Sequence, residues 1–268
     1  MHEEVAKKGI EIHLAPEVLF HIGSFPVTST LLTAVVVAAL LIFFAQRWGK
    51  NLTLKPSRLQ VVIEALIMVP YSLVRTTLGN DSVARKVFPI IMTTFLFILC
   101  VNWFGLLPFV ATVGLVHGDE VAPLFYPVAT DLNFTLALAL IAFFTIQISG
   151  IALLGVMNYG GKFITFSSPI AFAVGLIELI SEFARIISFA FRLFGNIFAG
   201  KVLLVIAVFL VPYVIPVPLL AFEVFVGLIQ AGIFAVLMLF FTKLAIAAPH
   251  ESEHSSEEGA HHAKAVSA

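Results

Sequence analysis

Five long apolar runs alternate with shorter polar segments along the chain. A helix that crosses the hydrocarbon core of a bilayer needs about 20 mostly apolar residues, and each run is close to this length or longer. The pattern therefore predicts transmembrane helices. We expect spans at about 27–45, 87–110, 132–157, 168–211 and 219–247, within a single transmembrane domain that covers 27–248.

A further apolar stretch, 59–78, is interrupted by Glu64, Pro70 and Arg75. These interruptions favour a helix that lies on or shallowly in the cytoplasmic face of the membrane. The expected fold is all-α: a polytopic membrane protein with about five transmembrane helices plus a cytoplasmic-side interfacial helix. Composition agrees, because 60% of the residues are hydrophobic and 12% are charged, whereas soluble domains carry about 25% charged residues.

Basic residues set the expected orientation. The loop after the first span contains Arg47, Lys50, Lys55 and Arg58 and no acidic residue. Short cytoplasmic loops are enriched in Lys and Arg, so this loop is expected inside and the N-terminal segment 1–26 outside. Five crossings then put the C-terminus in the cytoplasm.

The five-crossing count has one alternative. Segment 163–211 could form two spans, which would put the C-terminal tail outside. Lys162 follows the third span and Lys243 closes the last apolar run, both on the side expected inside, which favours five crossings. The tail, 249–268, is rich in Glu, His, Ser and Ala, and we expect it to be disordered.

The fourth predicted span, 168–211, is unusually long and polar on one side. As one helix it would measure about 66 Å, roughly twice the hydrocarbon thickness, so it must tilt steeply or bend. At 100° per residue, its polar residues gather within about 40° of one line. A lipid-facing stripe of this kind is too costly, so it must face protein, water or both. The stripe consists of Glu178, Ser181, Arg185, Ser188, Arg192 and Asn196.

Arg192 is the costliest member of the stripe, since an arginine at a helix centre costs at least about 2.5–3.5 kcal/mol on insertion scales. It indicates either a functional site or an ion pair inside the bundle. The last span carries Glu223 and Gln230 on one face, seven residues apart. Antiparallel packing would bring Gln230 toward Arg192 and would let Lys201 pair with Glu223. In a straight helix, however, Lys201 lies opposite Arg192.

Motifs of soluble enzymes are missing from the sequence. It contains no Gly-rich phosphate loop, nucleophile elbow or Cys/His metal box. We therefore expect no catalytic site within the chain, no cofactor, no metal site and no nucleic-acid partner. The single cysteine, Cys100, lies in an apolar run and is expected to be a packing residue.

Segment 192–200, Arg-Leu-Phe-Gly-Asn-Ile-Phe-Ala-Gly, closely resembles the signature of subunit a of F-type ATP synthases. The likeness extends to 130–133 and 228–231, and to Asn102 with the Leu-Leu-Pro that follows at 106–108. It covers essentially the whole chain. The sequence is thus similar to the membrane-embedded stator subunit of that enzyme.

The resemblance implies that the last two helices are long and steeply tilted and lie against a rotating ring of c subunits. Further expected partners are the peripheral-stalk b subunits, the catalytic head indirectly, and the lipid bilayer, in a bacterial inner membrane. Protons would enter one aqueous half-channel, protonate a ring carboxylate and leave through a second, offset half-channel. Arg192 would be the essential stator arginine. Glu178, Ser181 and Arg185 would line the cytoplasmic half-channel, and the outer one would contain Asn196, Lys201, Glu223 and Gln230, with Asn102 and Asp131 as further contributors.

Two positions depart from the family pattern. Lys201 stands where other members commonly have an acid or a histidine, and Gly105 stands where some place an acid. The resemblance therefore implies an outer relay that depends more heavily on Glu223 and on water.

Two other functions fit the same residues. A self-contained, ion-coupled secondary transporter would use Glu178, Arg185, Arg192 and Glu223 as its substrate site, and the purified chain alone would then transport solute. A structural membrane subunit would use the stripe as an internal ion-pair network. Neutralising Arg192 would in that case harm assembly more than conduction.

Overall fold

The computed structural model describes residues 18–50, 56–107, 110, 114–117, 120–161, 163, 169–212 and 214–247. Most of segment 1–26 and the tail 249–268 lie outside the described residues. The described part is dominated by helices, which confirms the expected all-α class. The helices are α2 (Ser29–Gly49), α3 (Arg58–Leu78), α4 (Asp81–Gly105), the 3-10 turn η1 (Val128–Thr130), α5 (Leu132–Leu154), α6 (Val156–Gly160), α7 (Pro169–Leu210) and α8 (Pro216–Ile246).

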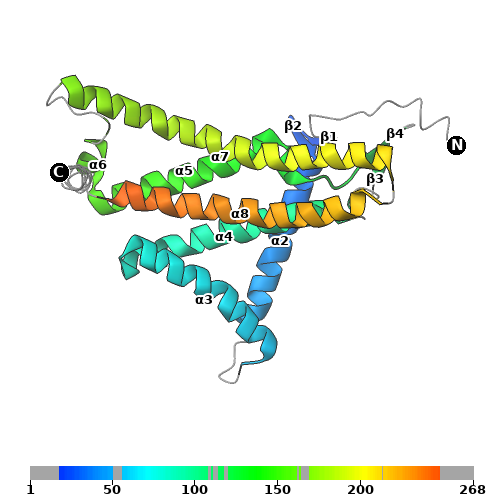
Figure 1. Ribbon diagram of the computed structural model, residues 1–268, viewed down its shortest axis with the longest axis horizontal. Helices are drawn as coiled ribbons and strands as arrows, with labels where there is room; N and C mark the ends of the chain where they lie inside the picture. Colours follow the sequence, from blue (N-terminus) through cyan, green and yellow to red (C-terminus); the bar gives the residue numbers. More distant parts are fainter. Residues whose placement is uncertain are drawn as a thin grey trace, which may run out of the picture.

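The structure also contains two short antiparallel hairpins. The sequence pattern did not predict these hairpins. In the first, Val18 of β1 (Val18–Ile22) lies opposite Thr28 of β2 (Phe25–Thr28). In the second, β3 (Gly114–His117) pairs with β4 (Glu120–Pro123). Figure 1 shows both hairpins toward the end of the molecule where α7 turns into α8.

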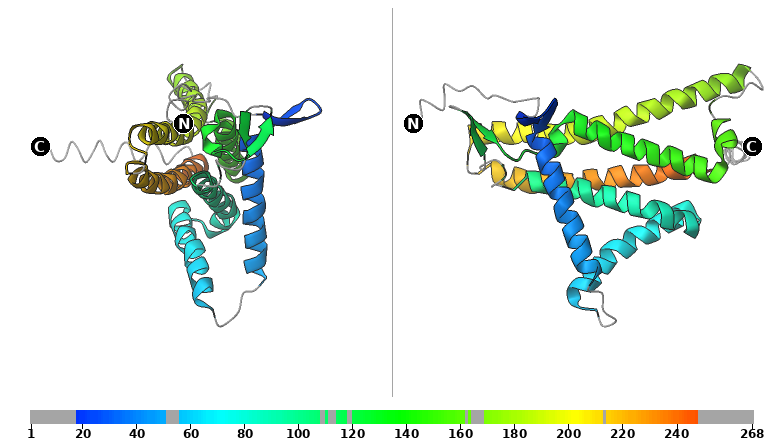
Figure 2. Two further views of the ribbon diagram at one scale, coloured as in Figure 1. Left: turned by 90° about the vertical axis from the view of Figure 1, so that its right-hand side faces the viewer. Right: turned by 180° about the vertical axis from the view of Figure 1, so that it is seen from behind.

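Helices α4, α5, α7 and α8 run side by side along the long axis, and α2 crosses them at a steep angle (Figures 1 and 2). Helix α4 packs against α8, and α5 packs against both α7 and α8. The turn between α3 and α4, the short α6 and the start of α7 lie at the end opposite the hairpins. The bundle thus has two opposite ends, joined by the two longest helices, α7 and α8.

Six helices are long and apolar enough to cross a membrane, judged by length and composition. The protein is therefore an integral, polytopic membrane protein. The sixth is α3, which continues as one helix through Pro70. Its apolar side chains are largely exposed, among them Leu59, Val62 and Met68. The interfacial position expected for this helix remains a prediction.

Helix α4 begins at Asp81, earlier than the expected start at 87. The side chain of Asn80 caps it by accepting hydrogen bonds from the backbone N–H groups of Ser82 at 2.9 Å and Val83 at 3.3 Å. Such a cap satisfies donors that the first helical turn leaves unpaired. The helix ends at Gly105, before the expected end at 110.

Helix α7 is one continuous helix of 42 residues, about 63 Å long. The expected long helix at 168–211 is thus present without a break. Its buried face contributes Phe189 and Leu193 to the core, where the Phe189 ring meets Phe234 of α8 with ring centroids 4.7 Å apart. Alanines on α5, including Ala142, are fully buried in the same cluster and allow the helices to approach closely.

The contact between α5 and α6 depends on Gly150. A Cβ at this position would clash with the aromatic ring of Tyr159. We expect Gly150→Ala to destabilise the protein by about 1–3 kcal/mol, the usual cost of overpacking. A lower midpoint of thermal unfolding in detergent would be the sign. Gly232→Ala is the control, because a Cβ there meets nothing within 4 Å; equal midpoints for the two variants would contradict the prediction.

Candidate functional site

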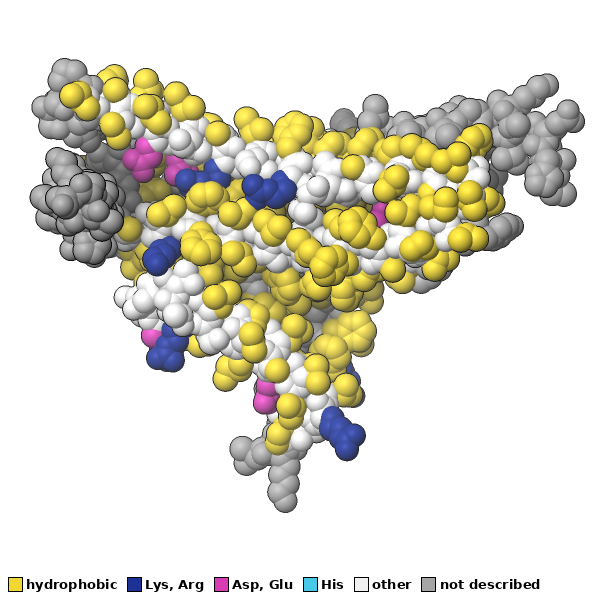
Figure 3. Space-filling view, in the orientation of Figure 1, with side chains coloured by type: hydrophobic (Ala, Val, Ile, Leu, Met, Phe, Trp, Pro, Cys, Tyr) yellow, Lys and Arg dark blue, Asp and Glu magenta, His cyan; other side chains and the backbone are white. Residues whose placement is uncertain are grey.

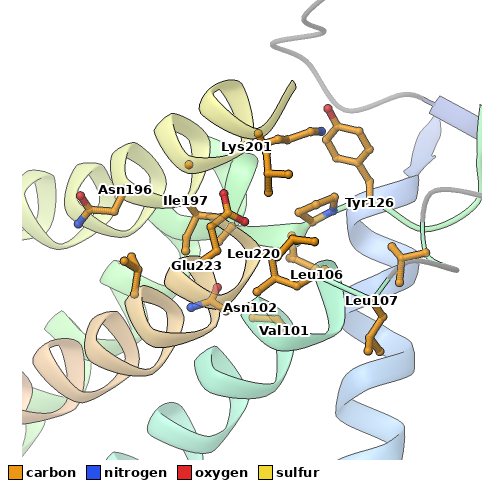
Figure 4. Close-up of a pocket in the computed structure, with 18 of the residues that line it drawn as sticks. Val101, Asn102, Leu106, Leu107, Tyr126, Asn196, Ile197, Lys201, Leu220 and Glu223 are labelled. Atoms are coloured by element: carbon orange, nitrogen blue, oxygen red, sulfur yellow. The ribbon is translucent and has the colours of Figure 1, made fainter. Parts of the chain in front are cut away.

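A cavity of about 800 Å³ lies between α4, α7, α8 and the segment that follows β4, near the hairpin end (Figure 4). Its walls are mostly apolar, yet they bring together polar residues from three helices. These polar residues coincide with nearly all of those expected in the outer half-channel. They are Asn102 of α4, Asn196 and Lys201 of α7, and Glu223 and Gln230 of α8.

Glu223 projects from α8 toward α7 (Figure 4). Its Oε1 atom is buried and has no hydrogen-bond partner in the described part of the chain. The carboxylate fits there because residue 200 is glycine: a Cβ on Gly200 would lie 2.6 Å from Oε1. Asn102 Oδ1 is likewise buried without a partner, while its Nδ2 donates to the Gly227 carbonyl at 3.3 Å. Both oxygens are acceptors suited to water in a polar recess.

From the sequence we expected Lys201 to pair with Glu223. In the structure its side chain turns toward Tyr126 instead. Its Nζ atom lies 3.1 Å from the centroid of the Tyr126 ring, a cation–π contact, and Figure 4 shows the two side chains facing one another. The reason is geometric, since Lys201 lies opposite Arg192 on α7 and faces the segment after β4. Lys201 and Arg192 thus occupy different environments.

Asp131 does not line the cavity. Its Oδ1 accepts from the backbone N–H of Asn133 at 2.9 Å and so caps α5. Its Oδ2 accepts a hydrogen bond at 2.9 Å from Thr30 of α2. These hydrogen bonds explain why Asp131 can be buried: it links α2 to the start of α5. A role in proton movement, expected from the resemblance, stays a prediction.

A second polar group lies at the other end of α7. Glu178 and Ser181 are exposed, as a stripe that faces water or another protein requires. Arg185 instead turns inward: its Nη1 donates to both carboxylate oxygens of Glu182 at 2.8 Å. Its Cζ atom lies 3.8 Å from the centroid of the Phe241 ring on α8.

Glu182 is itself buried, with 8% of its surface exposed. Gln147 Nε2 of α5 donates to Glu182 Oε2 at 2.8 Å, and the Tyr159 hydroxyl of α6 donates to Gln147 Oε1. Burial raises the pKa of Tyr159 to about 12, and the negative charge of Glu182 adds to this rise. The hydroxyl therefore remains a donor at all ordinary pH values. This network ties α5, α6, α7 and α8 together.

Four residues of these contacts were not predicted from the sequence: Glu182, Gln147, Tyr159 and Tyr126. Glu182 lies beside the stripe, so its charge within an apolar run was the available signal. The others form contacts that depend on helix packing and leave no local pattern. Among the described residues, no group of three or more His, Cys, Asp or Glu side chains could hold a metal ion.

Arg192 lies between the two polar groups. Measured along the helix axis, Glu182 is about 15 Å to one side and Lys201 about 13 Å to the other. Its Nη2 donates to Ser188 at 3.2 Å rather than to Gln230. Across the part of the chain that the structure describes, no ion pair reaches Arg192. Figure 3 shows charged side chains following α7 across an otherwise mostly apolar surface.

The residues of the alternative transporter site do not gather in one place. Glu223 lies beside Gly200, and Gly200 is about 22 Å along α7 from Arg185. Arg185 is paired with Glu182. A single substrate could not contact all of these charged groups at once unless it were extended along the helix.

Comparison with known proteins agrees with the resemblance in the sequence. The family model for the ATP synthase A chain matches residues 27–243. ATP synthase subunit a of Mycobacterium ulcerans (strain Agy99) is 33% identical over 239 residues, which cover 88% of this chain and 92% of the relative. ATP synthase subunit a of Campylobacter fetus subsp. fetus (strain 82-40) is 30% identical over 241 residues, which cover 90% and 99%. The chain therefore belongs to the ATP synthase A chain family, the proton-translocating membrane part of ATP synthase.

Proposed function

We propose that this chain is the proton-conducting stator subunit of its ATP synthase, with two offset aqueous half-channels separated by Arg192. Protons enter from one side, bind a carboxylate on the ring of c subunits, travel with the ring and leave through the other half-channel. The chain holds no catalytic site of its own in this proposal. The observation that carries it is the position of Arg192 on an accessible face of α7, between two separate polar groups.

The outer half-channel is the cavity between α4, α7 and α8. Glu223 supplies a carboxylate that can take up and release a proton, and its Oε1, which has no hydrogen-bond partner among the described residues, leaves an acceptor for water. Asn102 and Gln230 offer side-chain amides that both donate and accept hydrogen bonds. Asn196 lines the same cavity from α7, and it continues the polar path toward Arg192.

The cytoplasmic half-channel follows the exposed polar side chains of α7 at the opposite end. Glu178 and Ser181 lie on this face. Exposed polar groups at this depth would be unfavourable against lipid. Water and the ring surface are therefore the environment that suits them. The N-terminus outside, the C-terminus in the cytoplasm and a bacterial inner membrane are parts of the same proposal, as is docking of the peripheral-stalk b subunits.

Arg192 acts as a fixed positive charge, because a guanidinium does not lose its proton in proteins. A ring carboxylate that faces it is held ionised, since an opposite charge lowers the carboxyl pKa. The same charge repels a proton that would pass straight from one half-channel to the other. Each proton that crosses 100 mV releases about 2.3 kcal/mol. Blocking the direct path makes rotation the downhill route.

Disulfide cross-linking can test whether the polar face of α7 lies against the ring of c subunits. Ser188 is exposed and hydrogen-bonded to Arg192. We expect Ser188→Cys to cross-link to a cysteine introduced beside the ring carboxylate, in the whole complex under mild oxidation. Val35→Cys on α2, also exposed, is the control and should not cross-link. Efficient cross-linking of Val35→Cys but not of Ser188→Cys would contradict the proposal.

A further inference from the structure

Glu182 lies outside both proposed half-channels, and its burial needs an explanation. A buried carboxylate is tolerated when an opposite charge and hydrogen bonds replace its water shell. Arg185 supplies the charge and Gln147 supplies a further hydrogen bond. Tyr159 in turn fixes the amide of Gln147. Residues of three helices, α5, α6 and α7, thus hold one carboxylate in a single orientation.

Arg185 depends on this carboxylate for its charge balance. Its side chain is 15% exposed and that of Glu182 is 10% exposed, so water screens the pair only weakly. The other contact of its guanidinium, the ring of Phe241, carries no net charge. Loss of the Glu182 charge alone would leave a partly buried arginine that cannot become neutral.

The pair is close to the face that protons would follow. Arg185 comes four residues after Ser181 and seven before Arg192, about 10 Å from Arg192 along the axis. In the straight-helix pattern it falls on the polar stripe. The structure turns its guanidinium toward Glu182 and α8 instead, while Ser181 and Ser188 of the stripe stay exposed.

We infer that Glu182 is a positioning residue for proton transport: it neutralises Arg185 and holds it off the polar face of α7. Arg192 is then the uncompensated fixed positive charge on the described part of that face. The inference rests on the proposed function. Without Glu182, Arg185 would repel protons in the cytoplasmic half-channel and would compete with Arg192 for the ring carboxylate.

The test measures ATP-driven proton uptake by inverted membrane vesicles that carry the whole ATP synthase. We expect Glu182→Gln to slow uptake about tenfold, because an uncompensated charge on Arg185, about 10 Å from Arg192 along α7, raises the barrier by roughly that factor. The double variant Glu182→Gln with Arg185→Gln removes both charges and should return uptake close to the parent rate. Glu182→Asp keeps the negative charge, so its proton uptake should also stay close to the parent rate.

Parent-like uptake in Glu182→Gln would overturn the inference. Slow uptake in an assembled double variant would also overturn it, because the loss would then come from altered packing and not from the charge of Arg185. If Glu182→Gln fails to assemble, the double variant decides: assembly with near-parent uptake supports the inference, and any other result overturns it. Glu64→Gln, on exposed α3 surface, controls for loss of a carboxylate. Arg192→Ala separates the two proposals, because normal pumping in that variant would refute the proposed function itself.

Discussion

Arg192→Lys is expected to abolish ATP synthesis driven by an imposed proton gradient, although the complex still assembles. Lysine keeps a positive charge, but its ammonium is a compact point charge without the planar fork of donors that arginine offers. That fork lets Arg192 bind Ser188 and face a carboxylate at the same time. A lysine in a poorly solvated site can also lose its proton, and the barrier between the half-channels would then fail.

The measurement is ATP formed by vesicles after an acid–base jump, alongside the amount of this chain that co-purifies with the rest of the complex. Assembly should match the parent, because the guanidinium forms no ion pair within the described residues that packing would need. Normal synthesis in Arg192→Lys would refute the assigned role. Loss of assembly together with synthesis would favour the structural-subunit alternative.

Glu223→Gln is expected to slow proton transport by about a hundredfold, in the range typical for removal of a positioned proton-transfer group. Among the described residues, Glu223 is the carboxylate that lines the cavity proposed as the outer half-channel. Glutamine keeps the shape and the hydrogen-bonding capacity of the side chain but cannot take up a proton. The nearby Lys201 is engaged with the Tyr126 ring and is poorly placed to substitute.

ATP-driven proton uptake and gradient-driven ATP synthesis should fall together in Glu223→Gln. Glu223→Asp retains a carboxylate and should keep a measurable fraction of the rate. Gly200→Ala should also slow transport, because the new Cβ would displace the carboxylate. Unchanged rates in Glu223→Gln would mean that water alone conducts protons through the cavity. The role assigned to Glu223 would then be wrong.

The long helices were predictable from the sequence because their signals are local. Helix α7 has no proline between Pro169 and its end at Leu210, and its polar stripe fits one continuous helix. Five of the polar residues expected in the outer half-channel also lie together, since one cavity is lined by Asn102, Asn196, Lys201, Glu223 and Gln230. A glutamate and a glutamine seven residues apart on α8 necessarily share a face.

Contacts between distant segments were not predictable in this way. The pairing of Lys201 with Tyr126 instead of Glu223 depends on how the segment after β4 folds over α7. The inward turn of Arg185 depends on Gln147 of α5 and Phe241 of α8. One-dimensional periodicity assigns a residue to a helix face, but the neighbouring helix determines where a long side chain ends.

The barrier role of Arg192 is tested most directly by proton leak through the intact ATP synthase when ADP and phosphate are withheld. A coupled complex cannot turn continuously under these conditions, so any sustained proton flow bypasses rotation. We expect parent vesicles to hold an imposed proton gradient and Arg192→Ala vesicles to lose it rapidly. Equal retention of the gradient by parent and Arg192→Ala vesicles would show that Arg192 is not the barrier.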